Sequence, residues 1–107
     1  MRQYIKESLN LYIEHFEQLK YNIDALILFG SQARGTAVVS SDIDIAVVHS
    51  APLTSQERGT LRCLGEDIGI KTEINLFFTT PQAIADAEGI FDTNKYIREE
   101  GVVLWEK

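Results

Sequence analysis

The segment Ala25–Val48, ALILFGSQARGTAVVSSDIDIAVV, decides the fold of this chain. It contains two short apolar runs. The first ends at Phe29, directly before Gly30-Ser31, and the second begins within Asp42-Ile43-Asp44. Apolar runs of this length, interrupted by turn residues, are typical of buried strands. We therefore expect two strands, with Gly30-Ser31 at the end of the first and two acids at the start of the second.

The two acids of the second run have the spacing of neighbours on one strand face. Side chains alternate along a strand, so Asp42 and Asp44 project from one face while Ile43 and Ile45 project from the other. The carboxylates then lie about 6.5 Å apart, and at an effective dielectric constant of 20 they repel by about 2.5 kcal/mol. A divalent cation would reverse this repulsion, and carboxylate oxygens are the ligands that Mg²⁺ prefers. The pattern predicts a magnesium site at Asp42 and Asp44, and the alternative is a pair of exposed charges.

The Gly30-Ser31 turn has the features of an anion-binding site. A strand that breaks at Gly30-Ser31 and leads into a short helical turn leaves backbone N–H groups unpaired. Glycine permits a close approach of the backbone, and the free N–H groups attract a phosphate. Ser31 adds a hydroxyl and Arg34 a cation, so we predict phosphate contacts from Gly30, Ser31 and Arg34. The alternative is a turn glycine, a helix cap and a solvated guanidinium. A phosphate-binding turn beside a carboxylate pair indicates a site for a nucleoside triphosphate.

Composition narrows the class of protein. The formal net charge of −6 argues against direct binding of nucleic acid, which requires many Lys and Arg side chains. No apolar run approaches the length of a membrane span, and the first residues do not resemble a signal peptide. The single Cys63 excludes an internal disulfide and fits a reducing compartment, and its place in a helical pattern predicts a small core residue. We expect a cytoplasmic protein with one domain over residues 1–107.

Periodicity, capping signals and turn residues divide the remaining chain into further elements. These signals predict helices over residues 3–20, 54–69, 80–89 and 93–100, and strands over residues 72–78 and 102–105. Tyr96 and Ile97 are expected to face inward, and His49 is expected to be an exposed loop residue. The order of the elements indicates the α+β (or α/β) class, with a mixed sheet of three to four strands. The first two strands are expected to be neighbours, with the helices on one face.

Gly30-Ser31, ten intervening residues and then Asp42-x-Asp44 match the GS-x10-D-x-D signature of the DNA polymerase β superfamily of nucleotidyltransferases. The longer string FGSQARGTAVVSSDIDIAVV and the ending NKYIREEGVVLW resemble the minimal nucleotidyltransferases (MNT proteins) of bacteria and archaea. Either half of the signature alone is weak, whereas both halves at this spacing are specific. The resemblance implies the nucleotidyltransferase fold without the additional domains of larger relatives.

The resemblance also implies a function. Minimal nucleotidyltransferases typically act as antitoxins, which use Mg²⁺ and ATP to transfer AMP onto a tyrosine of a helical HEPN RNase toxin. Carried over to this chain, Asp42 and Asp44 would hold the metal, while Gly30 and Ser31, with Arg34, would bind the phosphates of ATP. Because the chain has no added domain to hold an acceptor, the hydroxyl must be presented by another protein or across a homodimer.

One position departs from the pattern of the superfamily. Where many relatives have a third carboxylate on the neighbouring strand, this chain has Asn75, whose amide oxygen can ligate a metal but brings no charge and cannot act as a base. Glu73, two residues away on the same strand face, is the candidate third ligand, and the alternative is an exposed charge near Lys71. The departure keeps open a second function, a non-catalytic nucleotide-binding antitoxin that neutralises its partner by forming a complex. A nuclease that depends on the Asp-x-Asp pair would leave the Gly-Ser turn unexplained.

Overall fold

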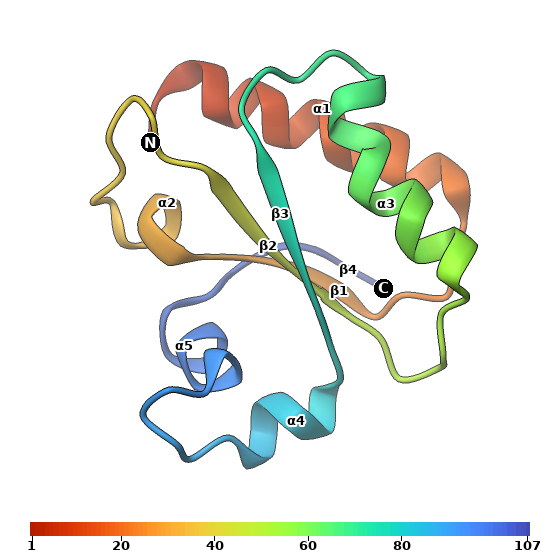
Figure 1. Cartoon of the computed structure of the whole chain (residues 1–107), viewed down its shortest axis with the longest axis vertical. Helices are drawn as coiled ribbons and strands as arrows, with labels where there is room; N and C mark the ends of the chain where they lie inside the picture. Colours follow the sequence, from red (N-terminus) through yellow and green to blue (C-terminus); the bar gives the residue numbers. More distant parts are fainter.

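The computed structural model describes all residues from 1 to 107. The chain forms a four-stranded mixed sheet that lies between helices (Figure 1). None of these helices combines the length and the apolar character that crossing a membrane requires. The elements in chain order are α1 (Gln3–Leu19), β1 (Ala25–Phe29), α2 (Gly30–Arg34), β2 (Ile43–Val48), α3 (Ser55–Asp67), β3 (Ile74–Thr79), α4 (Pro81–Asp86), α5 (Thr93–Glu100) and β4 (Val102–Glu106). The predicted α+β class with a mixed sheet is confirmed.

The sheet has the strand order β3-β2-β1-β4. β1 is antiparallel to both of its neighbours, while β2 and β3 are parallel. The first two strands are therefore neighbours, as predicted. The register places Phe29 of β1 opposite Asp44 of β2, and Asp44 opposite Asn75 of β3. The end of β1 and the beginnings of β2 and β3 thus meet at one end of the sheet.

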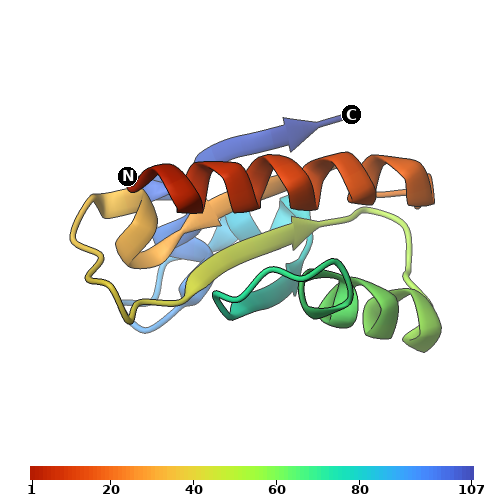
Figure 2. The ribbon, with the colours of Figure 1, turned by 90° about the horizontal axis from the view of Figure 1, so that it is seen from above.

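α1 and α3 cover one face of the sheet and enclose the main core. Figure 2 shows α1 lying along the sheet on the side of β1 and β4, with α3 on the side of β3. The Phe16 ring of α1 packs edge-on against Trp105 of β4, with 4.9 Å between ring centroids. The core consists of a helical stripe on α1, part of α3 and alternate strand residues: Ile5, Leu9, Tyr12, Phe16, Leu26, Leu28, Ile43, Ile45, Val47, Leu61 and Leu64. The burial of alternate strand residues confirms the expectation that successive side chains of a strand point to opposite faces of the sheet.

Helices also cover part of the second face, so the expectation of helices on one face alone is wrong. α4 and α5 lie on the opposite side of the sheet from α1 and α3 (Figure 1). The Thr79 hydroxyl of β3 donates a hydrogen bond to Asn94 of α5. On β2, Ala46 and Val48 are buried together with Ile45 and Val47. A continuous apolar run is typical of a strand that is covered on both faces, and the run Ile45–Val48 carried that signal.

The predicted helix starts are confirmed. Thr54 and Glu57 form the capping box that begins α3, because each side chain accepts a hydrogen bond from the other residue's backbone N–H. The Thr80 hydroxyl accepts from the backbone N–H of Ala83, with Pro81 at the first helical position of α4. These local hydrogen bonds need no tertiary partner, which explains why the sequence alone predicted them.

Three predictions of side-chain exposure were wrong. Cys63 is exposed, because it falls between the buried Leu61 and Leu64 and therefore points away from the sheet. Tyr96 is exposed, and only its neighbour Ile97 is buried on α5. His49 is buried, and its Nδ1 lies 2.8 Å from a backbone carbonyl oxygen two residues further on. The exposure of Cys63 thus follows from the helical period, whereas the exposure of Tyr96 and the burial of His49 depend on packing between elements.

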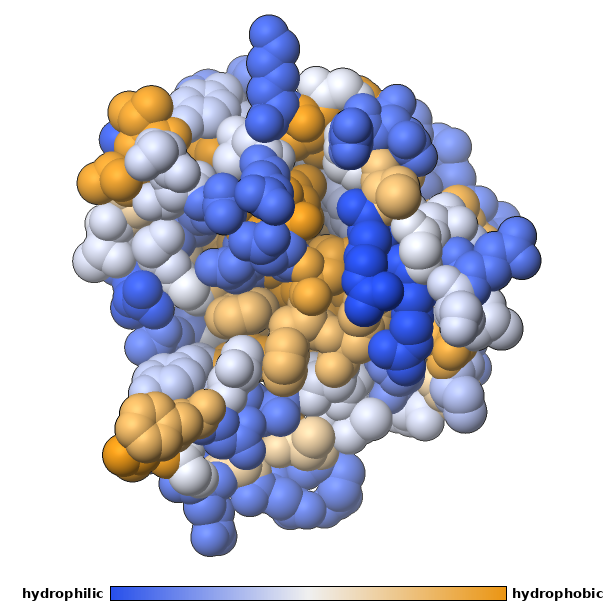
Figure 3. Space-filling view, viewed as in Figure 1, coloured by the Kyte–Doolittle hydropathy of each residue, from blue (hydrophilic) through white to orange (hydrophobic).

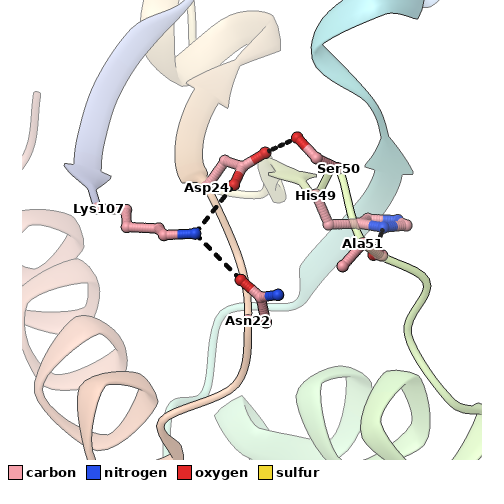
Figure 4. Close-up of polar contacts among 6 residues, drawn as sticks. All are labelled: Asn22, Asp24, His49, Ser50, Ala51 and Lys107. Carbon is pink, nitrogen blue, oxygen red and sulfur yellow. Dashed lines mark hydrogen bonds and ion pairs between the residues drawn. The ribbon is translucent and has the colours of Figure 1, made fainter.

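A polar cluster fixes the end of the sheet where β1 begins and β4 ends (Figure 4). The Nζ atom of Lys107 lies 3.7 Å from the Asp24 carboxylate and donates to Asn22 Oδ1 at 3.1 Å. The Ser50 hydroxyl donates to the other oxygen of Asp24. This hydrogen bond, together with the positive charge of Lys107, lowers the pKa of Asp24 below its ordinary value. The cluster therefore connects the segments that flank β1, β2 and β4.

The hydrogen bond from Tyr12 to the Leu61 backbone oxygen joins α1 to α3, with 2.9 Å between the oxygens. Burial raises the pKa of Tyr12, which keeps the donor protonated. We expect Tyr12→Phe to lower the free energy of unfolding by about 0.5–1.5 kcal/mol, the net contribution of one hydrogen bond. Urea denaturation would measure this change. Tyr21→Phe serves as the control, because the Tyr21 hydroxyl makes no hydrogen bond within the chain, and equal stability of the two variants would contradict the role of the bond.

We also expect Ser50→Ala to raise the pKa of Asp24, because the variant lacks the hydroxyl that stabilises the carboxylate. A lowered pKa in the folded state means that the ionised form contributes stability at neutral pH. That contribution is lost as the pH falls through the folded pKa. The stability difference between the wild type and Ser50→Ala should therefore shrink in acid. An NMR titration of the Asp24 carboxyl carbon in both proteins tests the shift, and identical titration midpoints would refute it.

Candidate active site

The Gly-Ser turn connects β1 directly to α2. Gly30 adopts a φ of +75°, in the left-handed region that favours glycine, and Gly35 ends the helix with a φ of +77°. The N-cap residue Phe29 makes no side-chain hydrogen bond to the first turn of α2. The first N–H groups of the turn therefore have no side-chain cap and remain available to an anion.

The turn lies against the acid pair. A Cβ atom placed on Gly30 would overlap the Asp44 carboxylate, whose Cγ lies 3.3 Å from that position. The cause is the pairing of Phe29 with Asp44 in the antiparallel register, which brings the residue after Phe29 over the Asp44 side chain. The structure thus places the two halves of the sequence signature in contact.

Asp42 and Asp44 lie on the same side of the sheet. Asp42 immediately precedes β2 and is exposed, while Asp44 is half-buried. Both carboxylates accept hydrogen bonds from the amide nitrogen of Asn75, at 3.2 Å to Asp42 Oδ2 and 3.4 Å to Asp44 Oδ1. The two carboxylates thus face a common point, the nitrogen atom of the Asn75 amide. The contribution of Asn75 as a donor was missed in the sequence, where only its oxygen was considered.

Glu73 is not brought to the acid pair. It is exposed, immediately before β3, and it lines a cavity of about 450 Å³ with residues of α3 and of the loop that follows, including Arg62, Glu66 and Lys71. No three side chains of His, Cys, Asp or Glu are grouped so that they could hold a metal ion. The structure therefore assembles two of the three predicted metal ligands and leaves Glu73 apart.

Arg34, the last residue of α2, forms an ion pair with Glu100 at the end of α5, with 3.1 Å between nitrogen and oxygen. The two side chains are 46% and 29% exposed, so solvent screens the pair and the guanidinium can change partners. The pair joins elements that are far apart in the sequence, and no local signal indicated it. A phosphate contact of Arg34 stays a prediction.

The donor set suits a magnesium ion that is shared with a nucleotide. Mg²⁺ in such sites is bound by one or two carboxylates, with water and substrate phosphates as the other ligands. Asp42 and Asp44 supply two carboxylates, and the Gly30-Ser31 turn lies beside them. The residues present therefore fit a metal–triphosphate better than a metal held by protein ligands alone.

The acid pair lies on an open surface, because neither Asp42 nor Asp44 lines any of the cavities of the protein. Figure 3 shows an apolar area near the middle of the molecule, where Figure 1 places β3, bordered by strongly hydrophilic side chains. On β3, the Phe78 ring lies beneath Arg58 and Arg62 of α3, whose guanidinium carbons are each 4.9 Å from the ring centroid. Charged side chains along an edge strand disfavour pairing with other strands. These two arginines therefore disfavour strand addition at β3, which is an edge of the sheet.

A family model described as "Polymerase beta, Nucleotidyltransferase" matches residues 11–104. The chain belongs to this family. The match includes the Gly-Ser turn, the acid pair and Asn75, so the superfamily indicated by the sequence signature is confirmed. A search of curated proteins gave no significant match.

Solved structures confirm the nucleotidyltransferase fold. A toxin–antitoxin structure with AMP-PNP matches with a TM-score of 0.66 at 23% identity, over 92% of this chain and 73% of the other. The structure of the tri-AMPylated Shewanella oneidensis HEPN toxin in complex with MNT antitoxin matches with a TM-score of 0.62 at 20% identity, over 95% and 72%. A candidate nucleotidyltransferase from Sulfolobus solfataricus gives 0.56 at 17% identity, over 100% and 91%. MNT antitoxins are thus among the structural neighbours of this chain.

Two glycine variants test whether contact with Asp44 matters for nucleotide binding. Gly30→Ala and Gly35→Ala both force alanine to a positive φ and should each destabilise the fold by about 1–2 kcal/mol. Only Gly30→Ala displaces the Asp44 carboxylate, since no atom lies within 4 Å of a Cβ at Gly35. We expect Gly30→Ala to weaken the binding of Mg²⁺ with AMP-PNP by about tenfold or more, a loss of about 1.4 kcal/mol. Isothermal titration calorimetry measures the affinity, and equal weakening in both variants would contradict the expectation.

Proposed function

We propose that this protein transfers AMP from ATP to a hydroxyl group of a partner protein, as the antitoxin of a HEPN-type RNase toxin. The observation that carries the proposal is the contact of the Gly30-Ser31 turn with Asp44, beside Asp42. A turn suited to phosphate and an acid pair suited to its metal share one surface. Membership of the Polβ nucleotidyltransferase family supports nucleotidyl transfer as the reaction.

In the proposed reaction the protein positions ATP and compensates its charge. Asp42 and Asp44 would hold Mg²⁺, which when bound supplies positive charge to the phosphates and polarises the α-phosphate. The backbone N–H groups of the turn and the Ser31 hydroxyl bind the terminal phosphates. The partner hydroxyl attacks the α-phosphorus and releases its proton to water, the bond between the α-phosphorus and the bridging oxygen breaks, and pyrophosphate leaves. The rate enhancement then comes from orientation and from electrostatic stabilisation.

The open surface around the acid pair supports a protein acceptor. The pair lines no cavity, so an acceptor must itself cover the bound nucleotide and exclude water. Structural neighbours include a tri-AMPylated HEPN toxin in complex with MNT antitoxin, and a toxin–antitoxin structure with AMP-PNP. These neighbours support AMP as the transferred group and a helical HEPN protein as its acceptor.

One observation favours a second candidate function, a nucleotide-binding antitoxin without catalysis. Asn75 stands where a third carboxylate would strengthen the metal site, and its amide is hydrogen bonded to both acids. Incubation with ATP, Mg²⁺ and a candidate HEPN partner protein, followed by mass spectrometry of the HEPN protein, separates the two functions. A mass increase by AMP units identifies the enzyme. A stable complex with no change in mass identifies the binding subunit.

The double substitution Asp42→Asn with Asp44→Asn tests the role of the acid pair directly. We expect incorporation of labelled AMP to fall by at least about 100-fold, a typical loss when a group that stabilises transition-state charge is removed. The melting temperature should stay the same or rise, because the substitution removes a repulsion between like charges. The exposed Asp67→Asn on α3 is the matched control and should label normally. Unchanged labelling in the double variant would defeat the proposal.

A further inference from the structure

The amide group of Asn75 bridges the two carboxylates of the site. β2 and β3 are parallel with Asp44 opposite Asn75, so the Asn75 side chain projects on the same side of the sheet as the acids. Its nitrogen has two N–H groups and lies 3.2 Å from Asp42 Oδ2 and 3.4 Å from Asp44 Oδ1. One donor group thus serves both acids of the pair.

In the metal-free protein, this hydrogen-bond bridge partly replaces a cation. Two ionised carboxylates on one strand face repel each other, and a donor placed between them offsets that repulsion. However, an amide N–H cannot ligate a metal ion. A cation that is shared by the two carboxylates must therefore displace these hydrogen bonds or force the amide to rotate.

We infer that Asn75 is a positioning residue which holds Asp42 and Asp44 together in the metal-free state and competes with a divalent cation for them. The inference rests on the proposed function only in taking this acid pair as the metal site. Its consequence is that a free cation binds weakly and that a cation carried by a nucleotide binds well. Mg²⁺ and Mn²⁺ lose their water ligands reluctantly. Two carboxylates that already accept hydrogen bonds from an amide compensate for little of this cost. The phosphates of a bound nucleotide supply the missing ligands at the adjacent Gly30-Ser31 turn.

The test measures metal affinity without any catalytic readout. Mn²⁺ is titrated into the wild type and into Asn75→Ala, with the free ion followed by electron paramagnetic resonance. Loss of one competing hydrogen-bond bridge should tighten the binding of Mn²⁺ alone by about three- to tenfold. With AMP-PNP present, the difference between the two proteins should become smaller, because the nucleotide supplies ligands of its own. Asn10→Ala, an exposed amide on α1, is the matched control and should bind Mn²⁺ as the wild type does.

The sign of the change in affinity decides the outcome. If Asn75 instead served as a metal ligand through its oxygen, Asn75→Ala would weaken Mn²⁺ binding, and the inference would be overturned. Unchanged affinity would overturn it as well. The result is independent of AMP transfer: tighter Mn²⁺ binding in Asn75→Ala supports the inference even if the wild type labels no partner protein, an outcome in which only the proposed function fails.

A second variant tests the bridge through stability. Asn75→Asp replaces the donor with a third carboxylate of nearly the same shape, so three negative charges would meet at one end of the sheet. We expect its melting temperature in EDTA to fall below that of the wild type and to recover when Mn²⁺ is added. A melting temperature in EDTA equal to that of the wild type would show that the amide bridge contributes nothing, and would contradict the inference.

Discussion

The antiparallel register of β1 and β2 is the constraint on which the site depends. It pairs Phe29 with Asp44 and so places the Gly30-Ser31 turn against the acid pair. A shift of one residue would turn every side chain of β2 to the opposite face. Such a shift would expose Ile43 and Ile45, both of which are fully buried beneath α1 and α3. The hydrophobic core therefore positions the polar site, although none of the core residues belongs to it.

At this end of the sheet, the neutral residue Asn75 compensates the repulsion between Asp42 and Asp44. At about 6.5 Å the two carboxylates repel by about 2.5 kcal/mol at an effective dielectric constant of 20. A hydrogen bond to a charged group contributes about 1.5–3 kcal/mol, so two such bonds from Asn75 are of the size needed to offset the repulsion. Solvent reduces both effects at these partly exposed side chains. The protein can thus hold the acid pair in place without a cation.

The elements on the second face of the sheet form the surroundings of the site. α4 and α5 cover part of that face, and the ion pair between Arg34 and Glu100 connects α5 to α2 at the turn. The acids themselves line no cavity, which leaves one side of the site to whatever molecule binds there. In the proposed function of this member of the Polβ nucleotidyltransferase family, that molecule is a nucleotide together with the partner protein that accepts AMP.

The sequence by itself determined the class of the fold, the capped helix starts, the adjacency of β1 and β2, and the shared face of Asp42 and Asp44. These features follow from short-range periodicity and from local hydrogen bonds, which a single segment of chain specifies. Only the tertiary structure decided that Asn75 donates to both acids, that Glu73 stands apart, and that Arg34 pairs with Glu100. It also decided that Tyr96 is exposed and that His49 is buried. Such features depend on which distant segments pack together and on the side-chain rotamers that this packing permits, and no local pattern contains that information.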